Sequence, residues 1–343
     1  MDKYRVAVIN SKSFGASSPD LIEKLRQHAE VDFLDVDKTL RGQQLAEALK
    51  GYHFIVASVT PTYDAEFFKH QRELLLIARH GIGVDNICIE AATEERVMVA
   101  RVPGFKERDA VAELAVALAL AVIRKVSFSH QLVKAGKWSE RGKIIGFNVA
   151  GKKVGVIGLG NIGSRVAEIY SKGFNAYVLA YDPYVKPEDA AKHGAHLVDL
   201  NTLLMESDLI TIHVPLLEST YHMIGEREFS KMKDGVIIVN TARGEILDTN
   251  ALIKALESGK ISGAGLDVIE GEPIGSDHPL LAFENVVITP HIGANTREGL
   301  RGMAESNIDA IIRVIRGEPP LEYLVNPEVL KKGTRAKLAA PKA

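Results

Sequence analysis

A glycine-rich turn after an apolar run constrains this chain more than any other feature. Residues 154–157 predict a buried strand, and Gly158, Gly160 and Gly163 follow at the spacing G-x-G-x-x-G. In this spacing the first glycine allows a tight turn and the second lets the backbone approach a pyrophosphate. The third lets the next helix pack closely on the strand. The segment therefore predicts a dinucleotide-binding domain.

The residues around this turn indicate which dinucleotide would bind. Free N–H groups at the helix start, near Asn161 and Ile162, favour an anionic ligand. A second apolar run ends in Asp182, about 20 residues beyond the third glycine. A carboxylate there accepts hydrogen bonds from the ribose hydroxyls and repels a 2′-phosphate. We therefore expect NAD rather than NADP, with a ligand-free glycine turn as the alternative.

Strand and helix patterns alternate on both sides of the turn, which predicts two doubly wound parallel-sheet α/β domains. The turn signal at Pro103-Gly104 marks a boundary between them. We expect one domain from 1–101 and 293–330 and the other from 102–292. Residues 331–343 are rich in Lys, Arg and Ala and predict a disordered tail.

A long apolar helix and a polar arm precede the glycine-rich turn. The helix is predicted over 108–126, and Glu113 is the only charged residue between Asp109 and Arg124. Such a helix is buried on most sides, either inside its own domain or at a subunit interface. Residues 134–141, which include the only tryptophan, Trp138, predict a polar arm.

Composition excludes several classes of partner. The net charge of −2 gives no general attraction to nucleic acid or to an anionic membrane. A single cysteine excludes an internal disulfide framework and fits a reducing compartment. No signal peptide or membrane span is predicted. We expect a cytoplasmic protein that holds no metal and acts on a small molecule.

Three successive predicted strands each lead into a chemically capable residue. The first leads to Arg243, the second to Asp267 and Glu272, and the third to His291. Parallel strands bring these ends to the edge that holds the glycine turn. Arg243 has the planar fork that suits a carboxylate, and His291 can exchange a proton near neutral pH. Glu272 would favour the imidazolium form of that histidine, and Asp267 can accept a hydrogen bond from the nicotinamide carboxamide.

Other strand ends carry weaker signals. The stretch Gly81-Ile82-Gly83 predicts either a backbone site for a carboxylate or a plain tight turn. A second loop, at 58–62, contains Thr60. His213 either lines the adenine pocket or only packs there, and the packing role is favoured.

Taken together, these motifs resemble the D-isomer-specific 2-hydroxyacid dehydrogenase family over roughly residues 50–327. The motifs are Gly81-Ile-Gly-Val-Asp-Asn86, Gly158-Leu-Gly-Asn-Ile-Gly163, Asp182-Pro183, His213-Val-Pro215, Asn240-Thr-Ala-Arg-Gly244, Leu266-Asp-Val268, Glu272-Pro273 and Thr289-Pro-His-Ile-Gly293. The resemblance implies a Rossmann NAD-binding domain, a smaller flavodoxin-like substrate domain, cofactor in the cleft between them and a homodimer. It also implies that Arg243 anchors substrate, that His291 is the acid/base and that Glu272 supports it. Glu272 argues against the related formate dehydrogenases.

We therefore predict an NAD-dependent oxidoreductase that interconverts a small 2-oxo acid and its D-2-hydroxy acid. Glyoxylate, hydroxypyruvate, pyruvate and bulkier oxo acids all fit. D-3-phosphoglycerate is an alternative, with Arg79, His80 or Lys106 as phosphate contacts. An NAD-sensing corepressor-like scaffold is the alternative from another class. The predicted substrate contacts are Thr60, Gly81, Ile82, Gly83, Arg243 and His291. The predicted cofactor contacts are Gly158, Gly160, Asn161, Ile162, Gly163, Asp182, His213, Val214, Pro215, Thr241, Ala242, Arg243, Asp267, His291 and Gly293.

Overall fold

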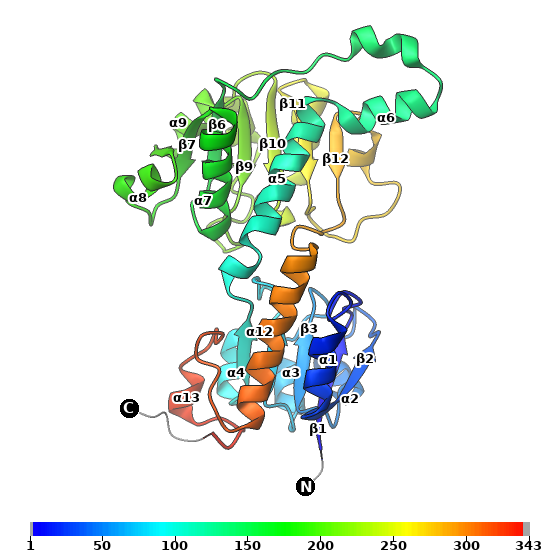
Figure 1. The fold of residues 1–343 in the computed structure, drawn as a ribbon, viewed down its shortest axis with the longest axis vertical. Coiled ribbons are helices and arrows are strands. Elements are labelled where there is room, and N and C mark those ends of the chain that lie inside the picture. Colours follow the sequence, from blue (N-terminus) through cyan, green and yellow to red (C-terminus); the bar gives the residue numbers. More distant parts are fainter. Residues whose placement is uncertain (1–2, 339–343) are drawn as a thin grey trace. The chain divides into compact units, whose positions relative to one another are not determined.

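The computed structural model describes residues 3–338, which divide into two compact units (Figure 1). Unit 1 contains the chain up to Glu107 and again from Ala294, and unit 2 is Arg108–Gly293. The first division lies a few residues after the predicted boundary at 101/102, and the second lies beside the predicted one at 292/293. No helix in the described range is long and apolar enough to cross a membrane.

Unit 1 is built on a five-stranded parallel sheet in the order β2-β1-β3-β4-β5. This is the flavodoxin-like order, so that prediction is confirmed. The strands are β1 (Tyr4–Ile9), β2 (Ala29–Leu34), β3 (Phe54–Ala57), β4 (Leu76–Arg79) and β5 (Met98–Arg101). The helices are α1 (Pro19–Arg26), α2 (Gly42–Ala48), α3 (Ala65–His70), α4 (Ile89–Glu94), α12 (Arg297–Ile315) and α13 (Val329–Lys332), with a 3-10 turn, η1, at Gly104–Lys106.

Helices cover both faces of this sheet, which is why β3 and β4 are buried along their whole length. One apolar cluster joins the sheet to α1 and α12, through residues such as Leu25 and Ile308. Another joins the opposite face to α2, α3 and α4, through Leu45, Phe67 and Ala92. The long helix α12 therefore returns from the end of unit 2 to complete the core of unit 1.

Unit 2 is built on a seven-stranded parallel sheet in the order β12-β11-β10-β9-β6-β7-β8. Its strands are β6 (Lys153–Ile157), β7 (Tyr177–Tyr181), β8 (Ala195–Leu197), β9 (Leu209–Ile212), β10 (Val236–Asn240), β11 (Ile261–Leu266) and β12 (Val286–Ile288). Its helices are α5 (Arg108–Ile123), α6 (Val126–Lys134), α7 (Asn161–Glu168), α8 (Pro187–Lys192), α9 (Leu200–Glu206), α10 (Glu226–Lys231) and α11 (Thr249–Glu257). Shorter helical turns are η2 (Trp138–Lys143), η3 (Ile169–Gly173), η4 (Gly244–Ile246) and η5 (Pro279–Ala282). Strand order reverses between β6 and β9, which is the Rossmann switch point where ligands bind.

The predicted single helix over 108–126 is wrong at its end. Helix α5 stops at Ile123, because Lys125 adopts a left-handed conformation (φ +50°), and α6 begins at Val126. One face of α5 is buried on the sheet and α7, with Ala119 fully buried. Helix α6 and the turn η2 project from the sheet of unit 2 (Figure 1). Most of the polar arm predicted over 134–141 lies in these two helical segments.

The predicted disordered tail is also wrong where the structure describes it. Arg335 donates to the carbonyl of Gln71 at 2.6 Å and pairs with Glu95 at 2.9 Å. Ala336 is buried against the core of unit 1. Composition indicated no core here, but contacts of Arg335 and Ala336 with unit 1 hold the segment in place. Residues 339–343 of the predicted tail lie outside the described residues.

Candidate functional site

The glycine-rich turn lies at the switch point of unit 2, between β6 and the loop after β9. Gly158 has φ +89°, which favours glycine, and a Cβ there would lie 2.8 Å from the side chain of Val214. A Cβ on Gly163 would overlap the Gly158 carbonyl, so this glycine lets α7 pack against the turn. A Cβ on Gly160 would meet nothing within 4 Å. The open space over Gly160, at the start of α7, suits an anionic group.

Asp182 is fixed at the end of β7, beside this turn. One carboxylate oxygen accepts from the N–H of Leu159 and the other from the N–H of Tyr184, each at 2.9 Å. A carboxylate has about four lone-pair sites, so each oxygen keeps capacity for a further donor. The backbone of the glycine turn therefore orients the acid from which the sequence predicted NAD binding.

His213 is held in its neutral form in the loop after β9. Its Nε2 atom lies 2.8 Å from the hydroxyl of Thr211, and its Nδ1 atom is buried with no partner among residues 3–338. Burial lowers the pKa of His213 to about 3. This hydrogen bond is compatible both with packing and with a place in the adenine pocket, the two roles that the sequence left open. The part played by Thr211 was missed, because a threonine within a strand is an ordinary strand residue.

A buried asparagine shapes the turn that carries Arg243. Asn240, at the end of β10, accepts from the N–H of Ala242 at 3.0 Å and donates to the carbonyl of Arg243 at 2.8 Å. The guanidinium of Arg243 donates to the carbonyl of Ala242 at 2.6 Å. The hydroxyl of Thr241 is buried without a partner in the described part of the chain. Asn240 was not predicted as a site residue, although it stands in the quoted motif.

His291 and Glu272 form a hydrogen-bonded pair between the loops that follow β12 and β11. A carboxylate can only accept, so Nδ1 of His291 carries the shared hydrogen. The other ring nitrogen, Nε2, can then give a proton to a ligand or take one from it. Glu272 also accepts from the N–H of Ile269 at 3.3 Å. His291 has φ +53°, and its N–H donates to the carbonyl of Asp267 at 2.8 Å. The two side chains remain 31% and 33% exposed, within reach of a ligand.

Asp267 organises the loop of His291, a role that sequence reasoning missed. Its carboxylate accepts from the hydroxyl of Thr289 at 2.6 Å and from the N–H groups of Ile292 and Gly293 at 2.8 Å. The residue itself is buried. Asp267 therefore ties both sides of His291 to the end of β11, and the predicted carboxamide contact would use the capacity that remains.

In unit 1 the predicted substrate residues follow β3 and β4. Asn86 donates to two carbonyls of the loop that holds Thr60, those of Ser58 at 3.1 Å and Pro61 at 2.9 Å. The N–H of Gly81 donates to the carbonyl of Arg79, so the expected exposed donor at Gly81 is wrong because the turn itself uses it. Within residues 3–338, Ile82 and Gly83 keep their N–H groups clear of such bonds.

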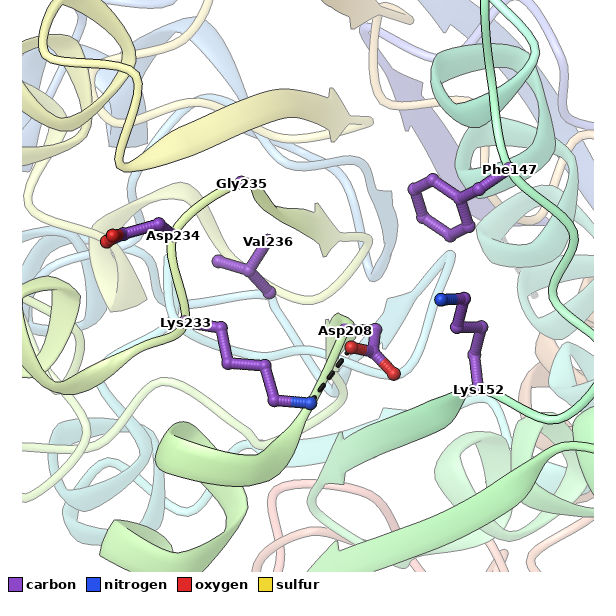
Figure 2. A pocket seen from close by; sticks show the side chains of 7 residues that line it. All are labelled: Phe147, Lys152, Asp208, Lys233, Asp234, Gly235 and Val236. Atoms are coloured by element: carbon purple, nitrogen blue, oxygen red, sulfur yellow. Dashed lines mark hydrogen bonds and ion pairs between the residues drawn. The ribbon is translucent and has the colours of Figure 1, made fainter.

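A cavity of about 180 Å³ lies at the opposite edge of the unit 2 sheet, where the strands begin (Figure 2). Lys233 pairs there with Asp208 at 2.9 Å. The lining residues are Phe147, Lys152, Asp208, Lys233, Asp234, Gly235 and Val236. None of them belongs to the glycine turn or to the loops that carry Arg243 and His291. Among the described residues no group of three or more His, Cys, Asp or Glu could hold a metal ion.

Comparison with known proteins gives a family and several relatives. A family model described as the NAD binding domain of D-isomer specific 2-hydroxyacid dehydrogenase matches residues 116–293. A glyoxylate reductase from Thermococcus litoralis is 44% identical over 292 residues, which cover 83% of this chain and 87% of that relative.

Two further matches differ in name and in length. A D-3-phosphoglycerate dehydrogenase from Archaeoglobus fulgidus is 44% identical over 286 residues. The match covers 83% of this chain but only 54% of that relative, so this chain spans about half its length. The crystal structure of D-lactate dehydrogenase from Aquifex aeolicus, complexed with NAD and lactic acid, matches with a TM-score of 0.80 and 30% identity. That match covers 93% of this chain and 98% of the other.

Proposed function

Because this chain belongs to the D-isomer-specific 2-hydroxyacid dehydrogenase family, we propose that it interconverts small 2-oxo acids and D-2-hydroxy acids with NAD. The observation that carries the proposal is the hydrogen-bonded pair of His291 and Glu272 at the strand edge that also holds Arg243 and the glycine turn. This edge joins a proton donor, a carboxylate anchor and a dinucleotide site, which is what reduction of a 2-oxo acid requires.

The residues at the switch point fit NAD. The open space over Gly160 and the start of α7 would receive the pyrophosphate, and the oriented carboxylate of Asp182 would accept from the adenosine ribose. The loop from His213 to Pro215 and the turn at Thr241–Ala242 would line the rest of the cofactor. Bound NAD supplies or receives the hydride.

The side chains of the chain then have separate tasks. Arg243 binds the carboxylate of the substrate and orients its C2 carbonyl. His291 gives a proton from Nε2 to the C2 oxygen in reduction and takes it back in oxidation. Glu272 stabilises the charged imidazole through Nδ1. Thr60 and the N–H groups of Ile82 and Gly83 are proposed as the substrate contacts of unit 1.

Glyoxylate, hydroxypyruvate and pyruvate are the proposed type of substrate. D-3-phosphoglycerate is a second candidate, supported by the Archaeoglobus relative. The three residues expected to contact the phosphate make this candidate less favourable. Arg79 and His80 are buried in unit 1, and Lys106 pairs with Glu305 at 3.6 Å. Burial also lowers the pKa of His80 to about 4, which disfavours a charged ring for binding phosphate.

A turnover panel tests the proposal. NADH oxidation would be measured with glyoxylate, hydroxypyruvate, pyruvate, a branched oxo acid and 3-phosphohydroxypyruvate. We expect turnover with an unphosphorylated acid, and preference for the phosphorylated one would establish the second candidate. No turnover with any of them, despite NADH binding, would favour the scaffold alternative.

We also propose a homodimer in the cytoplasm. Besides the buried face of α5, the projecting arm exposes large apolar side chains, namely Val126, Val133, Trp138 and Ile145. Exposed large apolar side chains gathered in one region are typical of interaction surfaces. They support a subunit interface here, beside the one that the sequence left open for the helix over 108–126. Sedimentation equilibrium of the parent and of a Trp138→Glu/Ile145→Glu variant tests it. A parent that is monomeric at micromolar concentration would contradict the dimer.

A further inference from the structure

A second histidine–glutamate pair lies beside the candidate site of unit 2. Nε2 of His222 lies 2.8 Å from a carboxylate oxygen of Glu270, and both side chains are about two-thirds buried, at 32% and 29% exposure. The ring of Tyr221 stacks on that of His222 at 4.1 Å between centroids. Neither member of the pair has a task in the function proposed above.

This pair connects three separate segments of the chain. His222 precedes α10, and its N–H donates to the carbonyl of Glu245 in the turn that follows Arg243. Glu270 lies two residues before Glu272, and its second oxygen accepts from the N–H of Thr249 at 3.4 Å. The pair therefore joins the turn that carries Arg243 to the turn that carries Glu272.

The two turns are already in close contact at Gly244. A Cβ on Gly244 would overlap the peptide between Ile269 and Glu270, so the backbones are in close contact there. The turns leave neighbouring strands β10 and β11, and within the described residues few side-chain contacts join them beyond the strand ends. The link from His222 to Glu270 is a second fixed point, made through the segment that pairs Ile224 with Leu247.

We propose that His222 and Glu270 are positioning residues, which hold Arg243 in register with the Glu272–His291 pair. The inference rests on the proposed function, because it assigns these two groups to a substrate anchor and an acid/base. A small displacement between two such groups can cost about 100-fold in rate, even when the change is remote from the reacting atoms.

The test compares His222→Ala with a matched control, His193→Ala. His193 pairs with Glu168 at 2.9 Å in the same unit and with similar exposure, but Glu168 lies at the far end of α7 from the glycine turn. For each protein one measures hydrogen exchange of the amides in 244–247 and 269–272. The kinetic readouts are kcat and KM for an oxo acid at saturating NADH, and the Kd of NADH.

In His222→Ala we expect exchange in both segments to quicken about tenfold or more, and kcat to fall about 10- to 100-fold. NADH affinity should stay near the parental value. His222→Gln should recover most of the rate, because its amide can still donate to Glu270. The double variant His222→Ala/Glu270→Gln should be no slower than His222→Ala, since both changes remove one interaction.

Unchanged exchange and kcat in His222→Ala would overturn the proposal, as would an equal loss in the His193→Ala control. If the parent turns over no 2-oxo acid, the proposed function fails. The exchange comparison then decides the positioning role by itself, because it does not depend on the reaction.

Discussion

At the scale of single residues, the proposal that His291 carries the proton chemistry can be tested directly. Reduction places negative charge on the substrate oxygen, and general acid catalysis of this kind contributes about 10²–10⁴-fold. We therefore expect His291→Ala to lower kcat by about that factor while the Kd of NADH stays nearly unchanged. The control is His196→Ala, an exposed histidine that stacks on Tyr177. Near-parental kcat in His291→Ala, with a primary isotope effect showing rate-limiting hydride transfer, would refute the assignment.

We propose that Glu272 supports the charged form of His291 during proton transfer. Its carboxylate accepts the Nδ1 hydrogen of His291, and an ionised partner favours the charged ring. Glu272→Gln keeps an acceptor there but removes the charge, so kcat for reduction should fall by about tenfold while the Kd of NADH stays near the parental value. The measurement is kcat with one oxo acid at saturating NADH. Parental kcat in Glu272→Gln would mean that Glu272 does not support the imidazolium.

We propose that Asp182 decides between the two nicotinamide cofactors. Its two oxygens accept from the N–H groups of Leu159 and Tyr184 and keep capacity for the hydroxyls of a ribose. The parent should use NADH with at least about tenfold higher kcat/KM than NADPH, a ratio that corresponds to about 1.4 kcal/mol. Asp182→Ala should narrow this ratio, because it removes both the ribose acceptor and the repulsion of a 2′-phosphate. Equal use of the two cofactors by the parent would contradict this role.

At the scale of elements, the segment after α13 stabilises unit 1. Truncation after Lys332 removes Arg335 and its bonds to Gln71 and Glu95. Hydrogen bonds of charged groups contribute about 1.5–3 kcal/mol each when buried. Solvent screens the partly exposed pair of Arg335 and Glu95, so the free energy of unfolding should fall by roughly 1–3 kcal/mol in total. Urea unfolding measures it, with truncation after Leu338 as the control because it keeps every contact described. Equal stability of the two truncated proteins would show that Arg335 contributes nothing.

At the scale of the whole molecule, each unit contains a buried histidine that stays neutral at mildly acidic pH. Burial lowers the pKa of His80 to about 4 and that of His213 to about 3, against 6.5 for an unperturbed ring. The unfolded chain therefore takes up these protons first. The stabilising contribution is complete above about pH 6.5 and is lost as the pH falls toward the folded-state values.

When the pH falls from 7 to 5, each of these histidines should lower the free energy of unfolding by up to about 2 kcal/mol. Urea unfolding at both pH values, for the parent, His80→Asn and His213→Asn, measures the contribution of each ring. Each variant should lose less stability on acidification than the parent, whatever its stability at pH 7. An unchanged pH dependence in both variants would show that neither ring titrates on unfolding.

The fold class and the cofactor could be predicted from the sequence because their signals are local. The spacing of Gly158, Gly160 and Gly163 and the acid at Asp182 are fixed by the geometry of one strand, one turn and one helix. Alternating strand and helix patterns predicted both sheets, and a parallel sheet brings the ends of its strands to one edge. This rule alone predicts that Arg243, Glu272 and His291 share a common edge.

Other features depend on contacts between residues far apart in the chain, and only the tertiary structure decided them. The buried carboxylate of Asp267 holds the loop of His291, and Asn240 closes the turn of Arg243. The tail looked disordered by composition, but the carbonyl of Gln71, which accepts from Arg335, lies 264 positions away. The link between His222 and Glu270 spans 48 positions. Composition and periodicity carry local preference, whereas such partners are selected by how the sheets and loops pack.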